Sequence, residues 1–381
     1  MGFGFSLLAF LLVLTPIVFI HELGHYWAAR RSGVVVEVFS VGFGPEIFGF
    51  TDRHQTRWKF SAIPLGGYVK MAEDTILKEE VTNYRKLGGY VKMAGDTNAA
   101  SAPDENAMSI KGSFQAASLK ARAFIVAMGP IANFIFGVAL IAAVYMSYGK
   151  VTVPSLVGEV HQGSAAEKAG LEVGDRVVSA NGYTIDDFNQ LRTYIFENPG
   201  QPVEMVVERD GGLINRTVIP DVVEDKCMMV SYGRLGVRSM GGEIKSLGLS
   251  AAVSAAAVDS FDMAITMLRG IGRLASGNAN QGEIGGPIKI AEISGRVASQ
   301  GFMSLMMFVA IISINLGLVN LLPIPSLDGG HLMFFGFEAV MGKPISPAIQ
   351  DLIMRGGMAL LLTLIVFVTF FDISSLFMAE C

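Results

Sequence analysis

Long apolar runs separated by polar segments dominate the chain and predict a helical membrane protein. A membrane-spanning helix needs roughly 20 mostly apolar residues. Four stretches meet this requirement, at residues 5–29, 123–148, 302–322 and 356–371. The first stretch lacks the basic start of a secretory signal peptide, so we expect it to be retained as the first span.

Other patterns predict soluble or surface structure between the spans. Residues 33–70 alternate apolar and polar positions with interspersed glycines, which favours short β-strands. Residues 151–222 indicate short strands, a capped helix that starts near Ser164, a second helix at 187–196 and tight turns, hence a small α+β domain. Residues 248–272 are rich in alanine but carry charges, which favours an amphipathic helix on the membrane surface.

The predicted fold class is therefore a multi-span α-helical membrane protein with a small membrane-associated β region and one soluble α+β domain. In chain order we expect a first transmembrane helix at 1–32, a β region and loop at 33–122, a second helix at 123–148, the soluble domain at 151–222, a linker with the surface helix at 223–298, a third helix at 299–335 and a fourth at 350–372.

Composition and charge agree with this class and exclude others. The chain is 51% hydrophobic and 17% charged, which excludes a disordered protein. A net charge of −5 gives no support to nucleic-acid binding. The cysteines, Cys227 and Cys381, lie far apart, so we expect neither a disulfide framework nor a cysteine zinc site. Lysines and arginines concentrate between the first two spans, which places that loop in the cytoplasm and residues 151–222 outside.

One segment is duplicated. Residues 65–75 recur as residues 87–97, and the two copies differ only at Glu73 and Gly95. Two copies do not make a solenoid. We interpret the repeat as a local duplication, and its role stays open.

The strongest chemical signal lies at the end of the first span, in His21-Glu22-Leu23-Gly24-His25. Residues four apart lie on one face of a helix, so His21 and His25 can bind one zinc ion. Glu22 can then act as general base on the attacking water. Ionisable groups at membrane depth are costly and indicate function.

A catalytic zinc needs a third protein ligand, and the end of the third span offers two. Pro323 and Pro325 break the helix there, which is tolerable at membrane depth where the backbone lines a protein cavity. Asp328 follows directly and is our choice, with His331 as the rival ligand. Without the histidine pair, Asp328 would instead be read as an ordinary Asp-Gly turn.

Together these motifs resemble the site-2 protease family of intramembrane zinc metalloproteases, peptidase family M50. The resemblance rests on His21 to His25, on the N-x-x-P-x-x-x-L-D-G pattern that begins at Asn320, and on Gly-Pro-Ile-Ala-Asn ending at Asn133. Residues 151–222 resemble a bacterial PDZ domain. The whole arrangement is similar to the bacterial regulators of sigma-E protease, but with one PDZ domain where the best-known members carry two.

The resemblance implies roles for particular residues. His21, His25 and Asp328 would hold Zn²⁺, and Glu22 would transfer the proton. Asn133 and Asn320 could hydrogen-bond the substrate or simply join helices. In the PDZ-like domain an extended peptide or free C-terminus would add as a strand beside the segment that contains Leu156, Val157 and Gly158.

The resemblance also implies substrates and a location. We expect cleavage of single-span membrane proteins, such as pre-cut anti-sigma factors and remnant signal peptides, within the lipid bilayer of a bacterial inner membrane. The strands at 33–70 could accept the unwound substrate or form a plain hairpin, and the PDZ-like domain could bind peptide or only exclude large substrates. The alternative is a catalytically silent membrane PDZ scaffold, which the intact motif disfavours.

Overall fold

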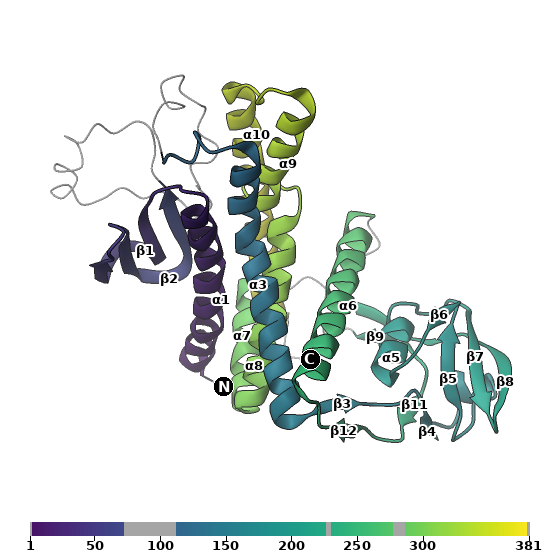
Figure 1. Cartoon of the computed structure of the whole chain (residues 1–381). Helices are drawn as coiled ribbons and strands as arrows, with labels where there is room; N and C mark the ends of the chain where they lie inside the picture. Colours follow the sequence, from purple (N-terminus) through teal and green to yellow (C-terminus); the bar gives the residue numbers. More distant parts are fainter. Residues whose placement is uncertain (1, 72–111, 226–229, 277–285, 379–381) are drawn as a thin grey trace. The chain divides into compact units, whose positions relative to one another are not determined.

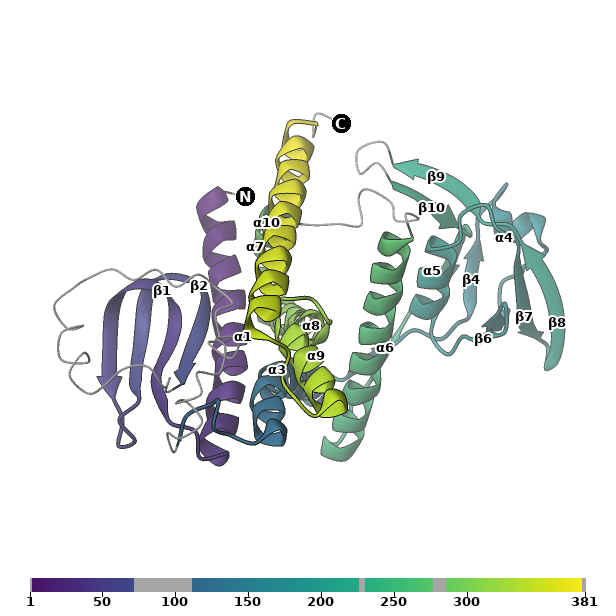
Figure 2. The same cartoon turned by 90° about the horizontal axis from the view of Figure 1, so that it is seen from above.

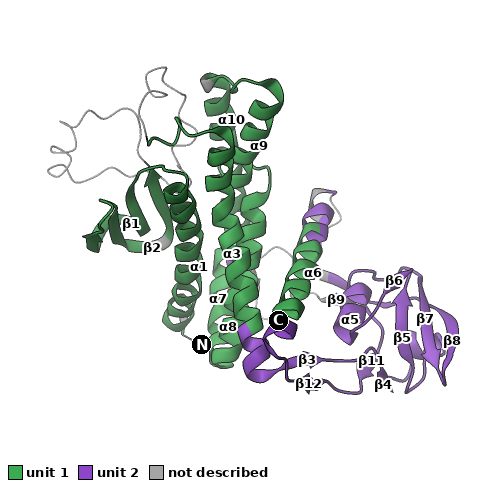
Figure 3. Ribbon diagram, viewed as in Figure 1, with its two compact units in different colours: residues 1–142, 253–268, 286–370 green, residues 143–252, 269–285, 371–381 purple. Residues whose placement is uncertain are grey.

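Figure 1 presents the computed structural model of the chain, which describes residues 2–71, 112–225, 230–276 and 286–378. The chain divides into two compact units (Figure 3). Unit 1 comprises residues 1–142, 253–268 and 286–370, and unit 2 comprises residues 143–252, 269–285 and 371–381. The second copy of the duplicated segment, residues 87–97, lies outside the described residues.

The four predicted spans are all long helices. They are α1 (Phe3–Arg31), α3 (Leu119–Tyr148), α8 (Phe302–Leu321) and α10 (Pro347–Met378). Each is long and apolar enough to cross a membrane. Helix α6 (Leu249–Ala275) also qualifies by length and composition, although the sequence predicts a surface helix there. The predicted count of four spans is therefore not confirmed.

Helix α1 ends as its sequence dictates. Arg30 and Arg31 occupy its last turn, where positive charge complements the helix dipole. Gly33 follows with φ of 78°, a left-handed conformation that glycine adopts at no steric cost and that terminates helices. The chain then turns directly into the sheet.

Helices α1 and α8 run parallel. Val13 and Ile17 of α1 are buried against Val309 of α8. Further along both helices, His21 of α1 lies within 3.2 Å of Asp328, which follows the end of α8. The residue numbers increase on both helices from the first contact to the second, so α1 and α8 point the same way.

Helix α3 runs opposite to α1 and α8. Its early residue Ile125 contacts His25, which lies near the end of α1. Its later residue Gly137 packs against Ile314, in the middle of α8. The three helices therefore form an antiparallel core in which α3 lies against both of the others.

Strands β1 (Val36–Thr51) and β2 (Arg57–Met71) confirm the strands predicted after the first span. Both strands bend, so each pairs with the other twice. Phe39, for example, pairs with Val69 on one side and with Trp58 on the other. Residues 67–71 pair with residues 36–41 and with no second strand in the described parts of the chain, so they form an edge.

The β1–β2 sheet lies beside α1 (Figure 2), and an aromatic cluster attaches it to that helix. Phe39 is 1% exposed and stacks on Trp58 with ring centroids 4.2 Å apart, while Tyr26 of α1 meets both rings edge-on. Burying one such phenylalanine contributes roughly 1.5–3 kcal/mol. Asp52 accepts hydrogen bonds from the Tyr26 hydroxyl and the Trp58 indole N–H, at 3.0 Å each.

The predicted break after the third span is present. Helix α8 ends at Leu321, and α9 (Asp328–Met341) begins at Asp328. Between them Ser326 takes a φ of 80°, which is uncommon for a residue with a side chain, and its hydroxyl donates to the Met354 carbonyl of α10. A shorter helix, α7 (Pro287–Ser299), precedes α8 and packs on α1, where Gly295 meets Ser6.

Unit 2 contains the predicted soluble domain. Its helices are α4 (Ala165–Lys168), capped by Ser164, and α5 (Phe188–Phe196), capped by Asp187. Its strands are β3 (Lys150–Thr152), β4 (Val157–Val160), β5 (Arg176–Ala180), β6 (Tyr183–Thr184), β7 (Val203–Arg209), β8 (Gly212–Val218), β9 (Asp221–Asp225), β10 (Val230–Arg234), β11 (Val237–Ser239) and β12 (Glu243–Lys245). The core of unit 2 lies between α5 and the β6-β5-β7-β8 sheet, around Leu191 and Met205.

The strands of unit 2 continue past residue 222, where the sequence predicts the end of the domain. Strand β11 pairs with β4, and β12 pairs with β3. These late strands return to the start of the domain, so the folded unit reaches at least to Lys245.

Candidate metal centre

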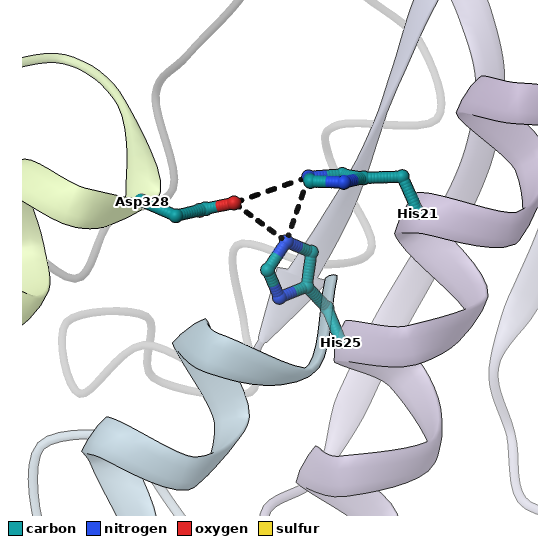
Figure 4. Close-up of side chains that lie close together, drawn as sticks. All are labelled: His21, His25 and Asp328. Atoms are coloured by element: carbon teal, nitrogen blue, oxygen red, sulfur yellow. Dashed lines mark hydrogen bonds and ion pairs between the residues drawn. The ribbon is translucent and has the colours of Figure 1, made fainter. Parts of the chain in front are cut away.

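Three side chains from two helices converge at the centre of unit 1 (Figure 4). His21 and His25 project from one face of α1, and Asp328 is the first residue of α9. The two Nε2 atoms are 3.2 Å apart. Asp328 Oδ2 lies 3.2 Å from His21 Nε2 and 3.5 Å from His25 Nε2.

This triangle of donor atoms fits a tetrahedral zinc ion. Zinc binds nitrogen and carboxylate oxygen at about 2.0–2.2 Å, so two ligands of a tetrahedral site lie about 3.3 Å apart. The three observed separations, 3.2, 3.2 and 3.5 Å, match that value. All three residues are buried, and apart from its contacts with the two histidines Asp328 Oδ2 has no hydrogen-bond partner among the described residues. A buried, unpartnered carboxylate oxygen is well satisfied by a cation.

The structure brings Asp328, not His331, to the two histidines. Among the residues that the structure describes, His21, His25 and Asp328 are the group able to share a metal. His331 lies three residues further along α9 and is 2% exposed. The sequence leaves this choice open because both residues follow the helix break.

Helix α3 contacts both histidines. His25 Nδ1 lies 2.9 Å from the Ile125 carbonyl, and His21 Nδ1 lies 3.2 Å from Asn133 Nδ2. Between them Gly129 lies so close that an added Cβ would meet His25 Nε2 at 2.2 Å. The absence of a side chain at this position lets α3 approach the site.

The sequence singled out Asn133 as a substrate or helix-joining residue, but not the contact of this face of α3 with the histidines, although a signal for it was present. Ile125, Gly129, Asn133 and Gly137 are each four residues apart and therefore form one stripe on the helix. A buried asparagine flanked by two glycines at this spacing indicates close packing around a polar contact. What the stripe contacts depends on how the helices align, which the sequence does not show.

Glu22 is buried beside the donor triangle. It interacts electrostatically with His21, His25 and Asp328. On the sheet side its Cγ abuts Gly67, where an added Cβ would approach within 2.9 Å. The predicted general base therefore lies between the metal ligands and the edge segment of β2.

The other predicted contact residues have different surroundings. Asn320 is half-buried in the last turn of α8, and its substrate role stays a prediction. In unit 2, Val157 exchanges main-chain hydrogen bonds with Asp175 and Gly174 on one side and pairs with Ser239 of β11 on the other. A peptide could add beside Leu156, Val157 and Gly158 only by displacing one of these partners.

Comparisons with known proteins agree with the motifs. The model of peptidase family M50 matches residues 9–364. A protein of Rhizobium meliloti named "putative zinc metalloprotease" is 39% identical over 98% of this chain and 97% of its own length. The metalloprotease MmpA of Caulobacter vibrioides is 34% identical over 98% of this chain and 96% of its own length.

Among solved structures, the PDZ domain of an SdrC-like protein from Listeria innocua is 17% identical. It covers 24% of this chain and 99% of the domain, with a TM-score of 0.20. The relatives named above match almost end to end, and the family model covers the donor triangle. The chain therefore belongs to peptidase family M50, as its motifs predict, and is a zinc metalloprotease of that family.

Proposed function

We propose that the chain is a site-2 type intramembrane protease that hydrolyses peptide bonds in or near the transmembrane segments of single-span membrane proteins. The observation that carries this proposal is the buried triangle of His21, His25 and Asp328, on or directly after helices apolar enough to span a bilayer. Pre-cut anti-sigma factors and remnant signal peptides are the expected substrates.

The residues of the site divide the chemistry between them. Zinc held by His21, His25 and Asp328 would polarise the scissile carbonyl and activate water. Glu22 accepts the proton of the attacking water and passes it to the leaving amine nitrogen. Its burial beside the donor triangle keeps this proton transfer away from bulk solvent.

The edge of the sheet gives the substrate a place to unwind. A helical substrate hides its peptide carbonyls, so the scissile stretch must become extended before it is cut. Residues 67–71 pair on one side with residues 36–41, and Gly67 abuts Glu22. An extended segment that adds to this edge would therefore lie next to the general base. The alternative is a sheet that only supports α1.

The helix directions support four crossings with the metal site toward the cytoplasmic side. If α1 runs from outside to cytoplasm, the parallel helix α8 must also begin outside. The chain leaves α3 outside, so an even number of crossings separates α3 from α8. Helix α6 alone would make that number odd, and α7, with 13 residues, is too short to compensate. We infer that α6 does not cross, and that unit 2 lies outside the inner membrane.

Replacing Glu22 by glutamine tests the proposal. Tagged single-span candidate substrates are co-expressed with the wild-type chain or with Glu22→Gln, and cleavage and bound zinc are measured together. The variant should retain zinc and lose cleavage by at least about 100-fold, because general-base catalysis contributes 10²–10⁴-fold. Glu292→Gln makes the same chemical change at the exposed Arg296 ion pair of α7 and should cleave normally.

Two results would contradict the proposal. Cleavage that survives in Glu22→Gln would remove the general-base role. A wild-type chain that binds zinc but cleaves no single-span protein, while its unit 2 captures their C-termini, would favour the scaffold instead.

A further inference from the structure

Each histidine of the metal centre makes one polar contact that the proposed ligation does not use, His25 with the Ile125 carbonyl and His21 with Asn133. His21 Nε2 belongs to the donor triangle, while its other ring nitrogen, Nδ1, lies 3.2 Å from the Asn133 side chain. Asn133 is 0% exposed and comes from α3, the helix that also contacts His25.

Metal ligation fixes what each Nδ1 must do. A neutral imidazole that binds a metal through Nε2 carries its proton on Nδ1 and donates it to a neighbour. For His25 the acceptor is present, because the Ile125 carbonyl lies 2.9 Å from Nδ1. His21 needs an equivalent acceptor, and Asn133 is the residue in reach.

The Asn133 amide can supply that acceptor. Its Nδ2 faces His21, while its Oδ1 is buried and has no hydrogen-bond partner among the described residues. A half turn about the Cβ–Cγ bond exchanges the two atoms, since the amide oxygen and nitrogen occupy equivalent positions. Oδ1 then accepts the Nδ1 proton of His21, and an unpartnered acceptor gains a donor.

We propose that Asn133 is a positioning residue for the zinc: its amide oxygen holds His21 in the tautomer and ring orientation that point Nε2 at the metal. Helix α3 then orients both histidines, through the Ile125 carbonyl and the Asn133 side chain. This inference rests on the proposed ligation by His21, His25 and Asp328. Outer contacts of this kind typically change metal affinity by 10–100-fold.

The competing explanation is that Asn133 only joins helices. Its main-chain carbonyl does so, because it accepts a 2.9 Å hydrogen bond from the Ser313 hydroxyl of α8. Ser313→Ala removes this bond and leaves the Asn133 amide in place, so it provides a matched control. If Asn133 only joined helices, replacing Asn133 and replacing Ser313 would both lower the stability of the chain, and neither would change its zinc affinity.

The experiment measures zinc affinity of the full-length chain in detergent by chelator competition. Asn133→Leu, which keeps the approximate size but has no acceptor, should bind zinc 10–100-fold more weakly. Asn133→Asp keeps an acceptor oxygen and should remain within about threefold of wild type. Ser313→Ala should bind zinc normally. Cobalt in place of zinc should give an altered visible spectrum in Asn133→Leu only.

The outcomes separate the two proposals. If His21→Ala loses zinc but Asn133→Leu and Asn133→Ala bind it as tightly as wild type, the positioning role is wrong and the ligation stands. If His21→Ala keeps wild-type affinity, the ligand assignment fails and this inference fails with it. Should Asn133→Leu not fold, Asn133→Ala and Asn133→Asp give the same comparison, because only the second retains an acceptor.

Discussion

Gly129 offers the sharpest test of the donor triangle, because its replacement by alanine adds one methyl group directly against a proposed ligand. The added Cβ would lie 2.2 Å from His25 Nε2 and 2.9 Å from His21 Cε1. Ordinary contacts between such atoms are about 3.5–4.0 Å. The His25 ring or α3 itself must therefore move by roughly 1 Å.

A shift of this size is large on the scale of metal coordination. Zinc–nitrogen bonds are about 2.0–2.1 Å, and working sites keep their ligand distances within roughly 0.2 Å. Displacing His25 by roughly 1 Å therefore removes a ligand. Removing an outer contact already costs 10–100-fold in affinity, so we expect Gly129→Ala to weaken zinc binding by more than about 100-fold. That factor corresponds to about 2.8 kcal/mol.

Chelator competition and a zinc count on the purified chain measure this loss. Gly137→Ala is the matched control, because it makes the same change two turns along α3. Its Cβ would lie 2.6 Å from Ile314 Cγ1 and 3.0 Å from the Ala310 carbonyl, away from the donor triangle. It should cost about 1–3 kcal/mol in stability through overpacking, yet bind zinc normally.

A folded Gly129→Ala chain with one zinc and wild-type affinity would refute the reasoning. It would mean that α3 can withdraw without disturbing His25. An equal loss of zinc in Gly137→Ala would be just as damaging, because the effect would then come from general disruption of the bundle.

Two further predictions concern acid sensitivity and topology. Burial alone would raise the pKa of Asp175, but hydrogen bonds from the Arg209 guanidinium and the Glu172 N–H lower it. The ionised Asp175 therefore stabilises the folded state fully at neutral pH. This stabilisation is lost as the pH falls below the pKa of an aspartate in the unfolded chain, about 3.9. The hydrogen-exchange protection of β5 and β7, corrected for the intrinsic exchange rate, should fall below about pH 4. Arg209→Met should weaken that pH dependence, because only the Glu172 N–H bond to the carboxylate then remains. Reporter fusions before and after α6 should lie on the same side of the membrane, whereas opposite sides would mean that α6 crosses.

Local patterns were enough to predict several elements of the site. The His21 and His25 pair follows from helical periodicity, because positions four apart share a face whatever the rest of the chain does. The break before α9 follows from Pro323 and Pro325, which cannot continue a helix. The strands after α1 follow from their alternating pattern.

Features set by contacts between distant segments could not be predicted in the same way. Whether Asp328 or His331 faces the histidines depends on where α9 begins and how it is rotated. The role of Gly129 depends on the depth at which α3 passes α1. The return of β11 and β12 to pair with β4 and β3 joins segments far apart in sequence, and no local pattern encodes such a pairing.

The placement of the ligands also has a consequence for the timing of activity. His21 and His25 are made first, but Asp328 emerges only after α3, strands β3 to β12 and α8 have been synthesised. A ribosome-bound chain therefore carries two ligands and a base but not a complete metal site. Hydrolytic capacity should appear only after Asp328 has been made and has folded against α1, which spares other newly inserted membrane proteins from a half-made protease beside them.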